Sequence, residues 1–146
     1  MLGVNPYDEF KIEMTEQEIQ EQQALWEIHA TKTKEQVMEK LQRFNQLYFQ
    51  YRHQVSVFRG KYTQAVLEQK RYKKAIPVMK INAKRFARSQ EELEEKLYWI
   101  KYNARKHKNE VFENEWLFYS SLEFMKEYKE KAELYKKALN WYAVFE

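Results

Sequence analysis

The chain has 146 residues, 26 Lys and Arg against 22 Asp and Glu, a net charge of +4 and no cysteine. Two glycines and two prolines are too few for the turns that a sandwich or barrel needs about every 8–12 residues, so all-β folds are excluded. Without cysteine there are no disulfides or thiol nucleophiles, and the lack of a long apolar run or signal-peptide pattern predicts a cytoplasmic protein without a membrane partner.

The N-terminal part divides into an arm and a helix. Residues 1–14 are acidic and show no sustained period, which predicts an irregular arm. Thr15-Glu16-Gln17-Glu18 fits a capping box and predicts a helix over about 16–31. Its apolar residues are sparse among Glu and Gln, so we expect this helix to need a packing partner.

A second capping box, Thr33-Lys34-Glu35-Gln36, predicts a helix over 34–76. Apolar residues then recur at alternating intervals of three and four, which is the seam of a long helix packed against partner helices. Pro77 is predicted to end this helix, because proline lacks a backbone donor and restricts the residue before it. The seam consists of Val37, Leu41, Phe44, Tyr48, Tyr51, Val55, Phe58, Tyr62, Ala65, Gln69, Tyr72 and Ile76.

Ser89-Gln90-Glu91-Glu92 predicts the next helix start, and a second seam of the same spacing runs from residue 93 to residue 142. Three of its members, His107, Asn114 and Ser121, are polar and fall in consecutive heptads. They indicate either a polar layer that sets the register or a kink. Although no Gly or Pro interrupts the stretch, we expect two helices that meet near residue 109.

These elements predict an all-α fold of long helices in a bundle or coiled-coil-like arrangement. We expect one helical domain over 15–146, with helices over about 16–31, 34–76, 90–107 and 110–143 and a basic connection over 70–90. The aromatic seams exceed what one short chain can bury, which favours a homo-oligomer. The tryptophans Trp26, Trp99, Trp116 and Trp141 are either base-stacking platforms or packed residues, and we expect them in the core or at a subunit interface.

Positive charge is concentrated in one block. Residues 70–90 carry eight bases and no acid, whereas residues 1–36 carry eight acids and three bases. Such a block repels itself unless anions occupy it, and interleaved aromatic rings suit the unpaired bases of single-stranded nucleic acid, DNA or RNA. The predicted nucleic-acid-binding residues are Lys70, Arg71, Lys73, Lys74, Lys80, Lys84, Arg85, Arg88, Tyr72 and Phe86.

Other partners of the block remain open. It suits an acidic protein if the chain is a structural or adaptor protein, such as an assembly chaperone, scaffold or host-factor inhibitor. Duplex DNA and an anionic membrane surface are weaker hypotheses, and Ile76-Pro77-Val78-Met79 is too short and broken for an amphipathic membrane helix. The basic block of residues 70–90 could also be an ordinary solvated surface without a partner.

The sequence contains no catalytic signature. His29, His53 and His107 are interpreted as isolated histidines, without a second ligand at zinc spacing on one helix face, and the last two as interfacial side chains. Two glycines exclude a Walker A or dinucleotide loop, and no di-iron motif occurs. We therefore expect a protein that is not an enzyme and has no cofactor or metal.

The layout resembles the UvsY-type recombination mediators of tailed phages over about residues 35–142. The resemblance lies in length, order and residue type, without a diagnostic motif. The segments that carry it are 47–51 (LYFQY), 66–72 (VLEQKRY), 115–119 (EWLFY) and 136–141 (KKALNW).

This resemblance implies a helical protein that forms rings in the host cytoplasm and binds single-stranded DNA. It further implies a role in loading a RecA-like recombinase onto DNA covered by single-strand-binding protein. DNA contacts would fall on Lys70 and Arg71, and assembly contacts on Tyr128, Tyr135 and Leu139. Pro77 and the added lysines depart from the small glycine-containing turn expected of the family.

Overall fold

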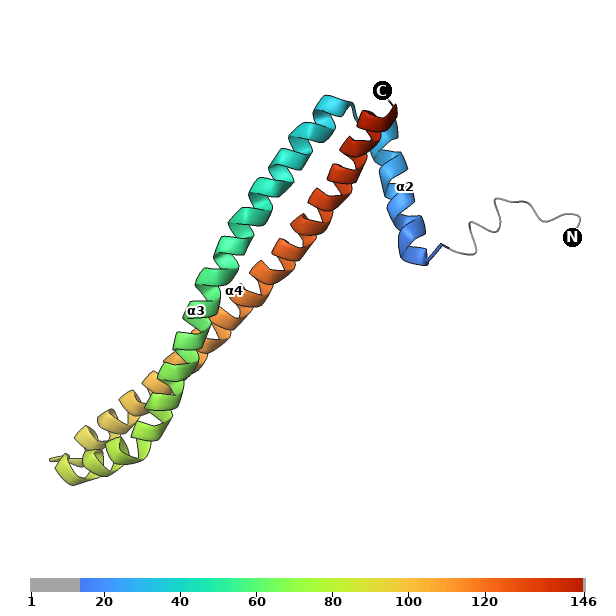
Figure 1. Cartoon of the computed structure of the whole chain (residues 1–146). Coiled ribbons are helices and arrows are strands. Elements are labelled where there is room, and N and C mark those ends of the chain that lie inside the picture. Colours follow the sequence, from blue (N-terminus) through green and yellow to red (C-terminus); the bar gives the residue numbers. More distant parts are fainter. Residues whose placement is uncertain (1–13, 146) are drawn as a thin grey trace, which may run out of the picture. The chain divides into compact units, whose positions relative to one another are not determined.

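Three helices make up almost all of the structure, a computed structural model that describes residues 14–145 (Figure 1). They are α2 (Glu16–Thr31), α3 (Lys34–Phe86) and α4 (Gln90–Phe145), and this range contains no strand. The predicted all-α fold is confirmed. The predicted arm, apart from residue 14, lies outside the described residues.

The three helix starts that were predicted from a cap are confirmed. Thr15 Oγ1 accepts the Glu18 N–H at 3.2 Å, and Ser89 Oγ accepts the Glu92 N–H at 3.1 Å. Thr33 forms a complete capping box: its Oγ1 accepts the Gln36 N–H at 3.3 Å, and Gln36 Oε1 accepts the Thr33 N–H at 3.0 Å. The cap at Thr33 lets α3 begin only two residues after α2 ends.

Thr33→Ala is expected to lower the free energy of unfolding by about 1 kcal/mol, because the amide of Gln36 loses its acceptor. Urea denaturation followed by far-UV circular dichroism measures this loss. Thr63→Ala is the control, since Thr63 Oγ1 only donates to the Arg59 carbonyl one turn earlier in α3. An equal loss in both variants would contradict the capping role.

The prediction that Pro77 ends this helix is wrong. The helix α3 continues to Phe86. The seam spacing continues beyond the proline at Met79, which is half-buried, and Ala83, which is buried. Packing on this side therefore outweighs the missing backbone donor. Pro77 itself lies on the exposed side of α3, and the ribbon bends in its yellow-green part, as proline within a helix causes (Figure 1).

The helix α4 is continuous, so the predicted break near residue 109 is wrong. Its polar seam residues are accommodated within the helix packing. Ser121 is buried, Asn114 Nδ2 donates to the Glu110 carbonyl at 2.8 Å, and the His107 ring lies 4.9 Å from the Tyr72 ring. The alternative left open by the sequence, a polar layer in the seam, is the one that the structure contains.

The described residues fall into two compact units. In the first, α2 and residues 34–48 of α3 pack with residues 126–145 of α4. Its core is the cluster of Ile28, Val37, Tyr135 and Ala138. The Tyr142 hydroxyl donates to the Lys32 carbonyl at 3.0 Å, and Lys137 pairs with Glu21, so α4 holds both α2 and the connection that follows it.

The second unit, residues 49–125, is an antiparallel hairpin of the rest of α3 and α4. Tyr51 stacks on Phe124 at 5.2 Å, and Tyr62 on Phe118 at 6.3 Å. Every member of both predicted seams is buried or half-buried, so the predicted packing faces are confirmed. Within residues 14–145, no helix has the length and apolar character needed to cross a bilayer.

Candidate nucleic-acid interface

The eight bases of the 70–90 block are all exposed, and seven of them lie on the last turns of α3. None occupies a seam position, and Lys80 borders a groove between α3 and α4. The block was predicted to run from the end of the helix over 34–76 into a connection, and the second part is wrong for Lys80, Lys84 and Arg85, because α3 continues through Pro77 and the connection comprises only residues 87–89. Arg88 alone lies in it. We call this exposed basic side of residues 70–88 the basic face.

No acidic side chain among residues 14–145 forms an ion pair with the basic face. Glu92 meets it only at the backbone, where its Oε2 accepts the Arg88 N–H at 3.0 Å. This hydrogen bond, and next the bond from Lys96, lower the pKa of Glu92 from its usual value. Because Glu92 contacts the backbone of Arg88, it forms no ion pair with the Arg88 guanidinium. No ion pair within the described residues therefore neutralises the basic face.

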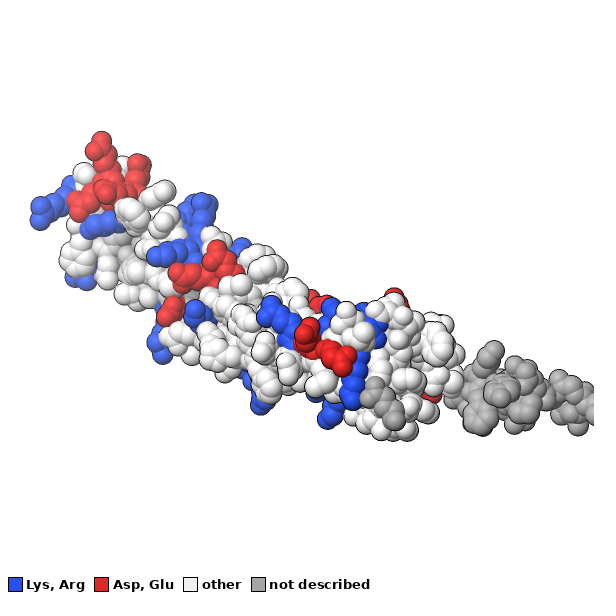
Figure 2. All heavy atoms as spheres, turned by 90° about the horizontal axis from the view of Figure 1, so that it is seen from above, with Lys and Arg blue, Asp and Glu red and all other residues white. Residues whose placement is uncertain are grey.

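The charge of the chain is divided unevenly between the two units. Residues 49–125 contain sixteen Lys and Arg against nine Glu, a net charge of +7, and the rest of the sequence has a net charge of −3. On the surface shown in Figure 2, acidic and basic side chains lie close to one another. The basic face is free of acids along α3, whereas Glu91, Glu92, Glu94 and Glu95 lie in the first turns of α4 at the same end of the hairpin.

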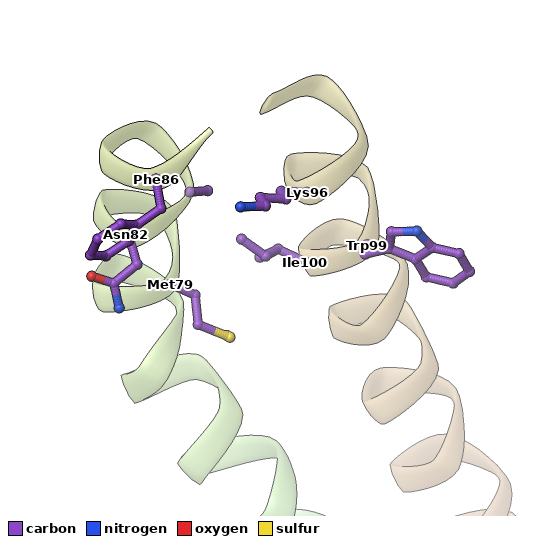
Figure 3. A pocket seen from close by; sticks show the side chains of 7 residues that line it. Met79, Asn82, Phe86, Lys96, Trp99 and Ile100 are labelled. Atoms are coloured by element: carbon purple, nitrogen blue, oxygen red, sulfur yellow. The ribbon is translucent and has the colours of Figure 1, made fainter. Parts of the chain in front are cut away.

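Two grooves flank the seam where the end of α3 meets the start of α4. Figure 3 shows Met79 pointing from α3, and Lys96 and Ile100 from α4, into the space of the first, whereas Trp99 points away from it. Lys80, Tyr98 and Lys101 border the second groove, which has a volume of about 630 Å³ and whose other lining includes Ile76, Leu97 and the acidic Glu94. Each groove thus combines apolar surface with an amino group.

Of the two aromatic residues predicted to stack on bases, only Phe86 is open. It is 62% exposed, and the Arg85 guanidinium lies 5.6 Å from its ring. Tyr72 lies in the seam, where its hydroxyl donates to the Ile100 carbonyl at 2.9 Å and its ring packs against His107. Its ring is engaged by the fold and does not belong to the basic face.

An exposed aromatic cluster, not predicted as a group from the sequence, lies on α4 and is formed by Tyr98, Trp99 and Tyr102. Trp99 lies 5.7 Å from Tyr98 and 5.3 Å from Tyr102, between ring centres. All three are exposed, and Lys101 lies among them in the sequence. Their positions off the seam, next to a base, were the available signal. All four tryptophans are at least 42% exposed, so none belongs to the core within the chain.

The residues to which the resemblance assigns assembly serve the core of the first unit. Tyr135 is buried 5.0 Å from Phe44, Tyr128 stacks on the same ring at 6.1 Å, and Leu139 packs against the core cluster. Exposed aromatic side chains suited to contact with another copy lie elsewhere on α4, at Phe112, Trp116 and Tyr119.

The interpretation of His107 as an isolated histidine is wrong. Glu110 lies three residues further along α4, and Glu68 approaches from α3. The first pairing was visible in the sequence, at the spacing that places two side chains on one helix face, but the second depends on the hairpin register.

No family model, no curated protein and no solved structure matches this chain. The likeness to UvsY-type mediators accordingly stays a prediction, and the geometry of the hairpin carries the functional argument.

Proposed function

We propose that this chain is a non-enzymatic protein that binds single-stranded nucleic acid along the basic face and acts as a recombination mediator. The observation that carries the proposal is the set of eight exposed Lys and Arg that have no acidic partner among the described residues. Phosphates would neutralise these charges and release the counterions condensed on the nucleic acid, which is the main source of sequence-independent affinity.

The exposed rings favour a single strand over a duplex. Phe86 lies in the basic face, and the cluster of Tyr98, Trp99 and Tyr102 lies close to its end of the hairpin. Unpaired bases can stack on such rings for about 1–3 kcal/mol each, whereas a duplex keeps its bases stacked on one another. No side-chain pattern of a base-reading helix is present in the sequence, so we expect little sequence preference.

The mediator role adds assembly to binding. Several copies on one strand would multiply the phosphate contacts, with a salt dependence of about −0.7 per phosphate in the logarithm of the binding constant. The exposed Phe112, Trp116 and Tyr119 are the surface that supports such assembly. Strand-bound copies would then engage a RecA-like recombinase and single-strand-binding protein, which is the part that rests on the resemblance.

The test is a fluorescence-anisotropy titration of a labelled DNA strand of about 40 nucleotides across a range of salt. The variant K70A/R71A/K73A/K74A should bind at least about tenfold more weakly than the wild type, with a shallower salt slope. The matched control, K40A/K126A/K129A/K136A, removes as many charges from exposed positions outside the basic face and should bind nearly as the wild type does.

Equal, salt-insensitive binding by the wild type and the first variant would overturn the proposal. Absence of binding at moderate salt, together with a stable complex with an acidic protein, would instead establish the adaptor function. A competition titration with duplex DNA of the same length separates single-strand binding from binding of duplex. The mediator role itself requires faster assembly of a RecA-like recombinase on strands covered by single-strand-binding protein.

A further inference from the structure

We infer that Glu68, His107 and Glu110 form a site for a divalent metal ion of the zinc class that joins α3 to α4. One donor atom from each residue lies within 4.8 Å of the others. His107 and Glu110 are three residues apart on α4 and therefore project from the same face. Glu68 completes the group from the opposite helix of the hairpin, so the site exists only when α3 and α4 are paired.

Two features of this group fit a bound cation. Nδ1 of His107 is buried and has no hydrogen-bond partner among the described residues, a situation that costs free energy unless a ligand is present. The carboxylates of Glu68 and Glu110 are half-buried, close to each other and in no ion pair within the described part of the chain. A divalent ion would offset the repulsion between them.

The donor set indicates which ion fits. One imidazole nitrogen and two carboxylate oxygens suit Zn²⁺ and related transition ions, whereas Mg²⁺ and Ca²⁺ prefer oxygen ligands alone. Around a tetrahedral zinc ion, donor atoms lie about 3.4 Å apart, given bonds of about 2.1 Å. Rotation of the flexible glutamate side chains is enough to close the observed separation. The three protein ligands leave one position for water.

Neighbouring side chains contact two of the three ligands. Gln64 Nε2 donates to Glu68 Oε1 at 3.2 Å, and the Tyr72 ring packs 4.9 Å from the His107 ring. Such outer contacts orient metal ligands and strengthen binding. The site also accounts for a polar residue at a seam position, because an ion bound there would fix the register of α3 against α4.

The experiment uses the full chain after treatment with EDTA, with Zn²⁺ in calorimetry and Co²⁺ as a spectroscopic substitute. We expect one ion per chain and visible Co²⁺ absorption that disappears in His107→Ala. Affinity should fall at least about tenfold in Glu68→Gln and Glu110→Gln. Because the ion binds only the paired helices, Zn²⁺ at about a hundredfold excess over Kd should raise Tm by about 5–10 °C.

His53→Ala and Glu94→Gln are the controls, since both side chains are exposed and lie outside the group. They should retain wild-type Zn²⁺ affinity and the Zn²⁺-dependent rise in Tm. The inference is overturned if the wild type binds no Zn²⁺, or if His107→Ala and Glu68→Gln bind it as the wild type does. Should His107→Ala fail to fold, the two Gln variants, which keep the side-chain shape, decide the question. None of these measurements involves nucleic acid, so the site stands or falls independently of the proposed function.

Discussion

Val37→Asp is expected to lower the free energy of unfolding by about 3–5 kcal/mol, because it places an unpaired carboxylate in a dry core. Val37 has 0% exposure and belongs to the cluster that joins α2, the start of α3 and the end of α4. The core cluster contains no base that could pair with the new charge. Urea denaturation followed by far-UV circular dichroism measures the loss.

Val144→Asp is the matched control for this variant. Val144 lies in the last turn of α4, in the same unit, and is 75% exposed. The new carboxylate stays hydrated there, and its repulsion by the helix C-terminus costs less than about 1 kcal/mol. If the two substitutions destabilised the protein equally, the first unit would not have the core described above.

Pro77→Ala is expected to raise the free energy of unfolding by about 1–3 kcal/mol. The substitution restores a backbone N–H in the interior of α3 and removes the clash of the proline ring with the preceding turn. Since Pro77 is exposed, no packing contact is lost with it. The greater freedom of the unfolded alanine chain reduces the gain but does not cancel it. Thermal unfolding should show a higher Tm.

Val78→Ala serves as the comparison for Pro77→Ala. Val78 is the next residue, 59% exposed, and its substitution changes only helix propensity, by less than about 0.7 kcal/mol. A Pro77→Ala protein that melts no higher than Val78→Ala would show that proline stabilises the bend, so that the helix depends on it.

Both proposed sites lie in the hairpin of residues 49–125. The basic face projects from the exposed side of α3, whereas the metal site lies at the contact between α3 and α4. Tyr72 contacts His107 within this seam. A bound ion would therefore stiffen α3, which carries the basic face. It would not use any Lys or Arg of the basic face as a ligand.

Much of the fold could be predicted because helical packing leaves a local pattern. The three caps are set by side chains within three residues of each other, and the seams by spacings of three and four. Both are properties of short stretches, and the structure confirms them. Pro77 shows the limit of local evidence: a proline normally ends a helix, but the continued packing at Met79 and Ala83 outweighs that preference.

The sequence by itself determined the all-α class, the helix starts, the packing faces and the acid-free run of eight bases. Only the tertiary structure decided that α3 and α4 are single continuous helices, that the seam residue Tyr72 bonds the Ile100 carbonyl, and that Glu68 meets His107 and Glu110. The physical reason is that caps and periodicity depend on neighbours along the chain. Contacts between the helices depend instead on the register in which residues far apart in the sequence are paired.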